Sequence, residues 1–380
     1  MRVAIIGAGM TAFGALWKQG LTELAVEANI KAILDSGIEK KKINALYVGN
    51  MSSGLYTKQE HISSMIAGAT GLSPIPSTRV EAACASGAAA LRQAFMAVKS
   101  GMHDCVIAAG VEKMTDVSST MSTRILSSAS SQDYEASIGA TFPGLYALIA
   151  RLHMHKFNTT EEQMAMVAVK NHQNALSNKY AHLQKKITVQ EVMDSQKIAD
   201  PLKLLDCAPI SDGAATVIVA SEEFAKKYCE TPIWIEASSQ ASDSISLHER
   251  KDLTSLAASK IAAREAFKAA GITQRDIGSL ELHDCFTIAE LLAIEDLEFC
   301  EKGKAGALTQ DGQTQYGGKI PVNMSGGLKA KGHPIGASGI AQAVEATWQL
   351  RGEKNQVHKK VMTHNVGGSG ATAIVHVFGR

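Results

Sequence analysis

The sequence is poor in proline, in aromatic residues and in excess charge of either sign. Of its 380 residues, 8 are proline and 5% are aromatic, and 38 basic against 37 acidic residues leave a net charge of +1. With 32 glycines against so few prolines, tight strand-to-helix turns are expected and proline-rich linkers are not. The balanced charge argues against a general nucleic-acid or membrane-surface binding protein, so we expect no nucleic-acid partner.

Cysteine pairs and long apolar runs are also absent. The 6 cysteines are spread along the chain with no C-x-x-C pair, so a disulfide framework is not expected and the reduced thiols of a cytosol are the default. No segment approaches the roughly 20 apolar residues of a membrane span. Residues 1–14 are typical of a first β-strand and lack the pattern of a secretory signal. We therefore expect a cytoplasmic protein without a membrane span.

What the chain does contain is an alternation of strand-like and helix-like segments. An apolar-periodic helix is expected from about Leu21 to Leu34. The strand candidates are Val3–Ile6, Ala45–Val48, Val106–Ala108, Thr216–Val219, Ile233–Ile235, Ser279–Leu282, Val361–Thr363 and Ala373–Val377. Alternation of this kind predicts an α/β fold with helices covering parallel or mixed sheets.

The sequence also repeats itself over a long period. Residues 28–48 resemble residues 262–282 without a gap, and in both copies a helix ends at glycine before a strand. A second pair, residues 84–101 and 336–352, shares Ala-Ser-Gly followed by a long helical segment. Two repeats in the same order predict a duplicated half-molecule.

The duplication leads to a division of the chain into three parts. We expect residues 1–118 with 201–231 to form the first half and residues 232–380 to form the second. Residues 119–200 have no counterpart in the second half and contain a serine-rich stretch followed by a helical segment at 161–176. We interpret them as an inserted loop lobe, more mobile than the body, where substrate contacts often lie.

Cys84 is the first candidate for chemistry. It lies where a short strand, Arg79–Glu81, is expected to turn into a helix, among small residues that permit a sharp turn. The positive end of a helix lowers the pKa of a cysteine and offers unpaired N–H groups that can hold an oxyanion. From these residues alone, an inert cysteine in a packing patch is an equal alternative.

Three further polar positions follow expected strands or occupy glycine-rich loops. In the segment His283-Asp284-Cys285-Phe286, alternation places the imidazole and the thiol on one face. A half-buried strand end or half of a zinc site are the alternatives there, but we expect no metal because no companion Cys/His pair has the usual spacing. His333 is held extended by the proline that follows it, and His364 begins a later glycine-rich loop.

The first strand raises a competing interpretation. Gly7-x-Gly9-x-x-Ala12 has the form of a dinucleotide-binding fingerprint, with Glu27 at roughly the expected acidic distance. A dehydrogenase of this kind would leave Cys84 and the histidine-bearing loops without a role.

Taken together, the motifs resemble the thiolase superfamily. They are similar in particular to the branch of sterol-carrier-protein-type and archaeal acetoacetyl-CoA thiolases, which carries H-D-C-F where other thiolases carry N-E-A-F. The resemblance covers essentially the whole chain and includes TAFG at 11–14, VAVKNHQNA at 167–175, ADPLKLLDCAPISDGAA at 199–215 and GHPIGASG at 332–339. It implies two duplicated βαβ-type halves packed as a layered α/β/α/β/α body with an inserted loop lobe.

The resemblance implies an acyltransferase that acts on coenzyme A thioesters without a further cofactor. Such an enzyme, an acetyl-CoA C-acetyltransferase or 3-ketoacyl-CoA thiolase, makes or cleaves a 3-ketoacyl-CoA through an acyl-cysteine. The residues implied are Cys84 as nucleophile, His333 as its base, Cys285 as the acid/base at the α-carbon in place of an absent C-x-G cysteine, and His283 as a donor to the enolate oxygen. Further residues implied are His364, Val366, Gly367 and Gly368 for an oxyanion hole or accessory contacts, and Met154 for the acyl pocket.

Several alternatives and partners accompany this resemblance. His364 is open to three roles: supplementing Cys285, contacting substrate, or packing. A ketoacyl-synthase-type enzyme would pair Cys84 with His333 and His364, and a thiolase-like scaffold or lipid-binding accessory subunit would need no chemistry. The resemblance also implies a homodimer or homotetramer, and assembly with HMG-CoA synthase through a small zinc-containing protein.

Overall fold

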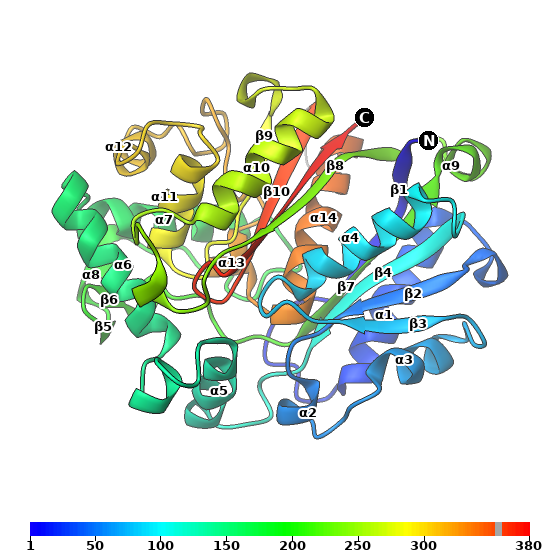
Figure 1. The fold of residues 1–380 in the computed structure, drawn as a ribbon, viewed down its shortest axis with the longest axis horizontal. Helices are drawn as coiled ribbons and strands as arrows, with labels where there is room; N and C mark the ends of the chain where they lie inside the picture. The colour runs from blue at the N-terminus through cyan, green and yellow to red at the C-terminus, as the bar shows by residue number, and fades with distance from the viewer. Residues whose placement is uncertain (354–358) are drawn as a thin grey trace.

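The computed structural model describes residues 1–353 and 359–380, and a mixed sheet of nine strands dominates this part of the chain (Figure 1). The strand order is β3-β2-β4-β7-β1-β8-β11-β10-β9. The strands are β1 (Val3–Met10), β2 (Ala45–Gly49), β3 (Ser77–Val80), β4 (Cys105–Glu112), β7 (Gly213–Ser221), β8 (Ile233–Ser242), β9 (Ser279–Glu281), β10 (Lys360–Gly367) and β11 (Thr372–Gly379), with β5 (Lys197–Ala199) and β6 (Leu202–Lys203) in a separate hairpin. Each strand expected from the sequence overlaps one of these.

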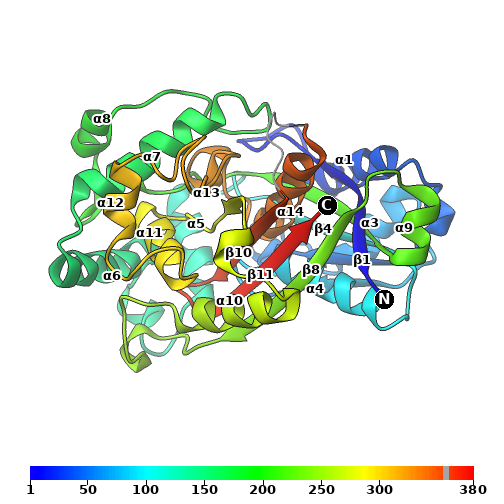
Figure 2. The ribbon, with the colours of Figure 1, turned by 90° about the horizontal axis from the view of Figure 1, so that it is seen from above.

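Helices cover the sheet on both faces (Figures 1 and 2). They are α1 (Leu21–Ser36), α2 (Ser53–Tyr56), α3 (Ile62–Thr70), α4 (Ser86–Lys99), α5 (Ser119–Leu126), α6 (Phe142–Phe157), α7 (Glu161–Ala175), α8 (Val189–Asp194), α9 (Glu222–Tyr228), α10 (Ala257–Ala270), α11 (Thr287–Asp296), α12 (Ala305–Gln310), α13 (Gly327–Lys331) and α14 (Ile335–Arg351). The chain is therefore an α/β protein, as predicted.

The same strand pattern occurs twice in the sheet. In the first half β2 is parallel to β4, and β4, β7 and β1 follow in antiparallel order. In the second half β9 is parallel to β10, and β10, β11 and β8 follow in antiparallel order. The two halves join where Ala4 of β1 pairs with Trp234 of β8. This repetition has the form that the sequence repeats predict, while the exact domain boundaries stay a prediction.

Two helices from different halves pack against each other with almost no side chain between them. Helix α14 contacts α4 and also β4, β7 and β10. A Cβ on Gly87 would lie 2.6 Å from the carbonyl oxygen of Gly336, and one on Gly339 would lie 2.3 Å from the backbone nitrogen of Ala88. The two Ala-Ser-Gly repeats therefore mark a helix crossing at which the backbones touch.

The glycines of the first strand serve packing and do not form a phosphate loop. Gly7 and Gly9 lie inside β1, and a Cβ on either would come within 2.4 to 2.6 Å of the Ala32 backbone in α1. A dinucleotide fingerprint needs its glycines in the turn between strand and helix. The dehydrogenase interpretation is therefore wrong.

Residues 119–200, predicted to be a loop lobe, are largely helical. They contain α5 to α8, and α6 and α7 contribute buried residues such as Leu145, Ile149 and Val167 to the core of the second half. Burial of these apolar side chains explains why the segment is ordered as helices. Among the described residues, no helix combines the length and apolar character needed to cross a membrane.

Candidate active site

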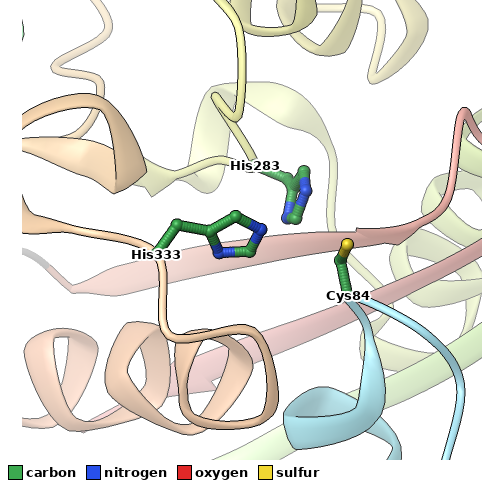
Figure 3. Close-up of side chains that lie close together, drawn as sticks. All are labelled: Cys84, His283 and His333. Carbon is green, nitrogen blue, oxygen red and sulfur yellow. The ribbon is translucent and has the colours of Figure 1, made fainter. Parts of the chain in front are cut away.

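Cys84 lies in a tight turn between β3 and α4. The preceding residue, Ala83, has a φ of +51°, in the left-handed region that non-glycine residues seldom occupy. Ser86 holds this turn, because its Oγ accepts from the Ala82 N–H at 2.9 Å and donates to the Ala83 carbonyl at 2.6 Å. The sharp turn predicted for Cys84 is confirmed, and it places the sulfur at the beginning of α4 (Figure 3).

The protonation of Cys84 differs from the sequence prediction. Burial raises the pKa of the Cys84 thiol to about 12, although the backbone N–H groups of Gly368 and of Cys84 itself point at the sulfur and act in the opposite direction. The sequence predicted a lowered pKa, and the net direction is the opposite because the loss of water around the sulfur outweighs these backbone N–H groups. At neutral pH the resting group is a thiol, so a nearby base must take its proton during attack.

His333 presents a free basic nitrogen to that thiol. Its Nδ1 lies 2.7 Å from Ser338 Oγ, and the single hydroxyl proton of Ser338 is donated to the Pro334 carbonyl at 2.8 Å. The serine can therefore only accept from His333, which fixes the imidazole proton on Nδ1. Burial lowers the pKa of His333 to about 3, and its Nε2 has no partner among the described residues. Nε2 thus carries a free lone pair.

His283 presents the opposite function, a hydrogen-bond donor. The side-chain amide of Asn365 donates to His283 Nδ1 at 2.9 Å, so the proton of the neutral ring must sit on Nε2. Burial, with smaller contributions from His333 and His364, holds the pKa of His283 well below its ordinary value. Its Nε2 also has no partner in the described part of the chain.

Cys84 and these two histidines meet at one point (Figure 3). The rings of His283 and His333 lie edge to face with centroids 5.1 Å apart. The sulfur and one nitrogen of each ring all lie within 4.8 Å of one another. One thiol and two imidazoles are also a donor set that zinc accepts, but atoms bound to one zinc ion at 2.0 to 2.3 Å lie about 3.3 to 3.8 Å apart. The cluster as it stands fits proton transfer better than metal binding.

An apolar cavity of about 90 Å³ opens beside this cluster. Its lining residues are Cys84, Met114, Leu126, Phe142, Tyr146, Ala208, Pro209, Ile210, Cys285, Phe286, His333, Ile335 and Gly368. Both candidate sulfurs and the candidate base therefore share one cavity, although they come from three distant segments. Burial and the proximity of Cys84 raise the pKa of Cys285 well above its ordinary value.

Other predicted residues lie elsewhere. His364 bonds to Ser259 of α10 at 2.8 Å, and Val366 belongs to the core of the second half. Gly367 packs against the Ala82 backbone, and Met154 packs on the core. Within the described residues none of these four lines the cavity, whereas Gly368 does. For His364 the structure favours packing over contact with substrate.

Comparison with known proteins places this geometry in a family. Residues 3–223 match the model of the thiolase N-terminal domain, and residues 239–380 match that of the thiolase C-terminal domain-like family. The chain belongs to the thiolase family. The thiolase fold expected from the resemblance is thereby confirmed.

Individual known proteins resemble the chain over nearly all of its length. It is 56% identical to an acetyl-CoA acetyltransferase of Methanothermobacter thermautotrophicus, with 100% of this chain and 99% of the relative covered. It is 37% identical to sterol carrier protein 2 of Bos taurus over 98% of this chain and 71% of that protein. Among solved structures, an Ltp2-ChsH2(DUF35) aldolase matches with a TM-score of 0.87 at 27% identity, covering 100% of this chain and 97% of the other.

Three residues of the thiolase site escaped the sequence analysis. Ser338 orients His333, Asn365 orients His283, and Tyr146 lines the cavity. One signal was available: Ser86 and Ser338 occupy equal places in the two Ala-Ser-Gly repeats, and each holds the segment that carries a candidate catalytic residue. Asn365 adjoins His364 in the sequence, and nothing in the sequence singles out Tyr146.

Asp284 ties the two histidine-bearing segments of this thiolase together. Its side chain points away from the cavity, accepts from the Leu328 N–H at 2.6 Å and the Lys329 N–H at 3.2 Å, and accepts from Asn171 at 2.7 Å. A Cβ on Gly327 would lie 2.2 Å from this carboxylate, so glycine is required for the approach. The segment held in this way leads directly to His333.

Replacing Asp284 with asparagine should destabilise the protein. An amide has one acceptor oxygen, so its NH₂ group would face an N–H donor in a buried site. We expect the free energy of unfolding to fall by about 2 to 5 kcal/mol, measured by denaturant titration. The matched control is Asp276→Asn, an exposed aspartate that accepts from the Thr273 N–H at 2.8 Å, for which about 1 kcal/mol or less is expected. Equal losses for the two variants would contradict this role of Asp284.

Proposed function

We propose that this thiolase is an acetyl-CoA C-acetyltransferase, an acyltransferase that condenses two acetyl-CoA molecules to acetoacetyl-CoA and catalyses the reverse thiolysis. The observation that carries the proposal is the meeting of the Cys84 thiol and the free His333 nitrogen at a small apolar cavity that also contains Cys285. The name of the 56% identical relative supports the same reaction.

In the first step Cys84 Sγ attacks the carbonyl carbon of acetyl-CoA while His333 Nε2 takes the thiol proton. Transfer during the attack suits a pair that is neutral at rest, because neither partner has to be ionised in advance. The carbonyl oxygen becomes an oxyanion. The backbone N–H groups of Cys84 and Gly368, which point at the sulfur, are the donors that we assign to it.

The bond between the acetyl carbon and coenzyme A then breaks. We assign the proton for the leaving thiolate to Cys285, which shares the cavity. This choice leaves Cys84 acetylated, His333 protonated and Cys285 as a thiolate, with no change in total charge. A thiolate ready to act as a base and an imidazolium ready to act as a donor are the groups that the second step needs.

In the second step the Cys285 thiolate removes a proton from the methyl group of another acetyl-CoA. His283 Nε2–H and the protonated His333 are the proposed donors to the enolate oxygen. The enolate carbon attacks the acetyl carbon on Cys84, the carbon–sulfur bond breaks, and the Cys84 sulfur recovers its proton from His333. Acetoacetyl-CoA leaves, and all three groups return to their resting protonation.

The cavity favours short acyl groups. A cavity of about 90 Å³ is small for a ligand site, which suits an acetyl group better than a long chain. We therefore expect thiolysis of acetoacetyl-CoA to exceed that of 3-ketooctanoyl-CoA by at least about 10-fold in kcat/KM, because each excluded methylene costs transition-state binding. A spectrophotometric thiolysis assay with both substrates measures this ratio. Equal rates would contradict the short-chain assignment.

The alternatives predict different outcomes with acetyl-CoA. A scaffold or lipid-binding subunit would leave Cys84 unmodified, whereas the proposed enzyme acetylates it in the absence of other proteins. A ketoacyl-synthase-type enzyme would use His364, which bonds instead to Ser259. A cytoplasmic location, a homodimer or homotetramer, and assembly with HMG-CoA synthase through a small zinc-containing protein stay predictions. Gel filtration with light scattering tests the oligomer directly.

A further inference from the structure

Tyr146 lines the same cavity as the two cysteines Cys84 and Cys285. Tyr146 belongs to α6, outside the motifs that carry the resemblance, and only 1% of its surface is exposed. Its Oη donates to the carbonyl oxygen of Gly368 at 3.3 Å, and its side chain lies close enough to Cys285 for each group to shift the pKa of the other. Its ring packs on Phe286 with centroids 4.8 Å apart.

These contacts connect the two sulfurs through one residue. The backbone N–H of Gly368 points at Cys84 Sγ, and the carbonyl of the same residue accepts from Tyr146. A tyrosine hydroxyl has one proton, so Tyr146 can donate either to Gly368 or to Cys285 at a given moment. While Cys285 is a thiol, its own S–H can donate to Oη. Once Cys285 has lost its proton, a hydrogen bond between the two side chains requires Tyr146 to be the donor, beside the backbone N–H of Phe286.

We propose that Tyr146 is a positioning residue for Cys285, whose hydroxyl turns from Gly368 to the Cys285 thiolate and stabilises it between the two half-reactions. The inference rests on the proposed function, because only a two-step reaction requires this thiolate to persist. No bond other than a hydrogen bond changes at Tyr146, which keeps its own proton throughout.

The environment of Tyr146 suits a permanent donor. Burial, with the nearby Cys285 and Cys84, raises the pKa of Tyr146 well above its ordinary value, so the phenol does not ionise in the working range. The hydrogen bond from Tyr146 in turn lowers the pKa of Cys285, against the larger effects of burial and of Cys84. A buried thiolate next to a second sulfur depends on the few donors that reach it.

The variant Tyr146→Phe removes Oη and keeps the ring that packs on Phe286. We expect acetylation of Cys84 by acetyl-CoA to continue, and condensation to acetoacetyl-CoA to fall by about 10- to 100-fold, as for the loss of a hydrogen bond to a charged group. A second measurement does not depend on activity. In a Cys84→Ala background, the pH midpoint for alkylation of Cys285 by iodoacetamide, followed by peptide mass spectrometry, should rise by about one to two units.

The chain offers a matched control in Tyr56. It is also buried, but its hydroxyl bonds to Ser122 Oγ at 2.8 Å and not to a cysteine, so Tyr56→Phe should leave the alkylation midpoint of Cys285 unchanged. An unmoved midpoint in Tyr146→Phe would overturn the inference and show that the tyrosine only packs. Failure of the unmodified protein to acetylate Cys84 would instead overturn the proposed function. The alkylation midpoint would still report whether Tyr146 lowers the pKa of Cys285, because it does not depend on turnover.

Discussion

Replacing Cys84 with alanine should abolish formation of the acyl-enzyme and reduce turnover by about 10⁴-fold or more. The reason is that no other group can form the thioester, and the loss of a nucleophile removes nearly all covalent catalysis. The cavity, Cys285 and His333 remain in place, so binding of acetyl-CoA should persist. Incubation with radiolabelled acetyl-CoA, followed by denaturation and counting of protein-bound label, measures the acyl-enzyme, and a coupled assay measures turnover.

Cys300→Ala is the matched control for this experiment. Cys300 is also a partly buried free cysteine, but it packs on the core of the second half and does not line the cavity. It should keep both labelling and turnover. Retained thiolysis in Cys84→Ala would show that the nucleophile has been assigned to the wrong residue, whatever the family membership.

The sequence predicted the parts of the site that belong to local motifs. The turn at Cys84 followed from small residues before an expected helix, and the structure reaches it with a positive φ at Ala83. Side chains alternate along an extended backbone, so the sequence predicted that His283 and Cys285 point to one face and Asp284 to the other. Neither spacing nor composition links residues 84, 283 and 333. Only the resemblance to the thiolase superfamily predicted that His333 belongs to the same site.

The roles of His364 and Asn365 could not be predicted in this way. They are neighbours in β10, so their side chains point to opposite faces, and one of them must face α10 while the other faces the site. The structure settles the register: His364 bonds to Ser259 and Asn365 bonds to His283. The sequence alone does not show which of two consecutive polar residues faces the site and which faces the neighbouring helix.

The burial of Cys84 also could not be predicted from the sequence. The start of α4 predicts a favourable dipole at Cys84, but the apolar surroundings that raise its pKa come from Met114, Ile335 and other distant residues of the cavity. The same limit applies to residues 119–200. The helix expected at 161–176 is present as α7, but the serine-rich composition of the stretch before residue 138 is typical of a loop, and nothing in the sequence predicts that α6 packs on the second half and brings Tyr146 to the cavity.

Replacing Cys285 with serine should separate the two half-reactions. A hydroxyl is a far weaker acid than a thiol, so the variant can neither hold an anion at this position nor remove the α-proton. We expect condensation to fall by about 10²- to 10⁴-fold, the range over which general bases contribute. Acetylation of Cys84 should survive, because His333 can return its proton to the leaving coenzyme A when Cys285 cannot supply one. Rapid-quench detection of acetyl-enzyme alongside acetoacetyl-CoA formation measures both steps.

The comparison variant is Cys229→Ser, which changes a partly buried cysteine whose sulfur lies 3.8 Å from the Ile6 carbonyl, away from the cavity. Both steps should continue in it. If Cys285→Ser fails to acetylate Cys84, then the Cys285 proton is indispensable for release of coenzyme A in the first step, and His333 cannot replace it. If it condenses at the unmodified rate, another group removes the α-proton. His364 could not do so in place, because it faces Ser259, so that outcome would require the cavity to rearrange when the acyl-enzyme forms.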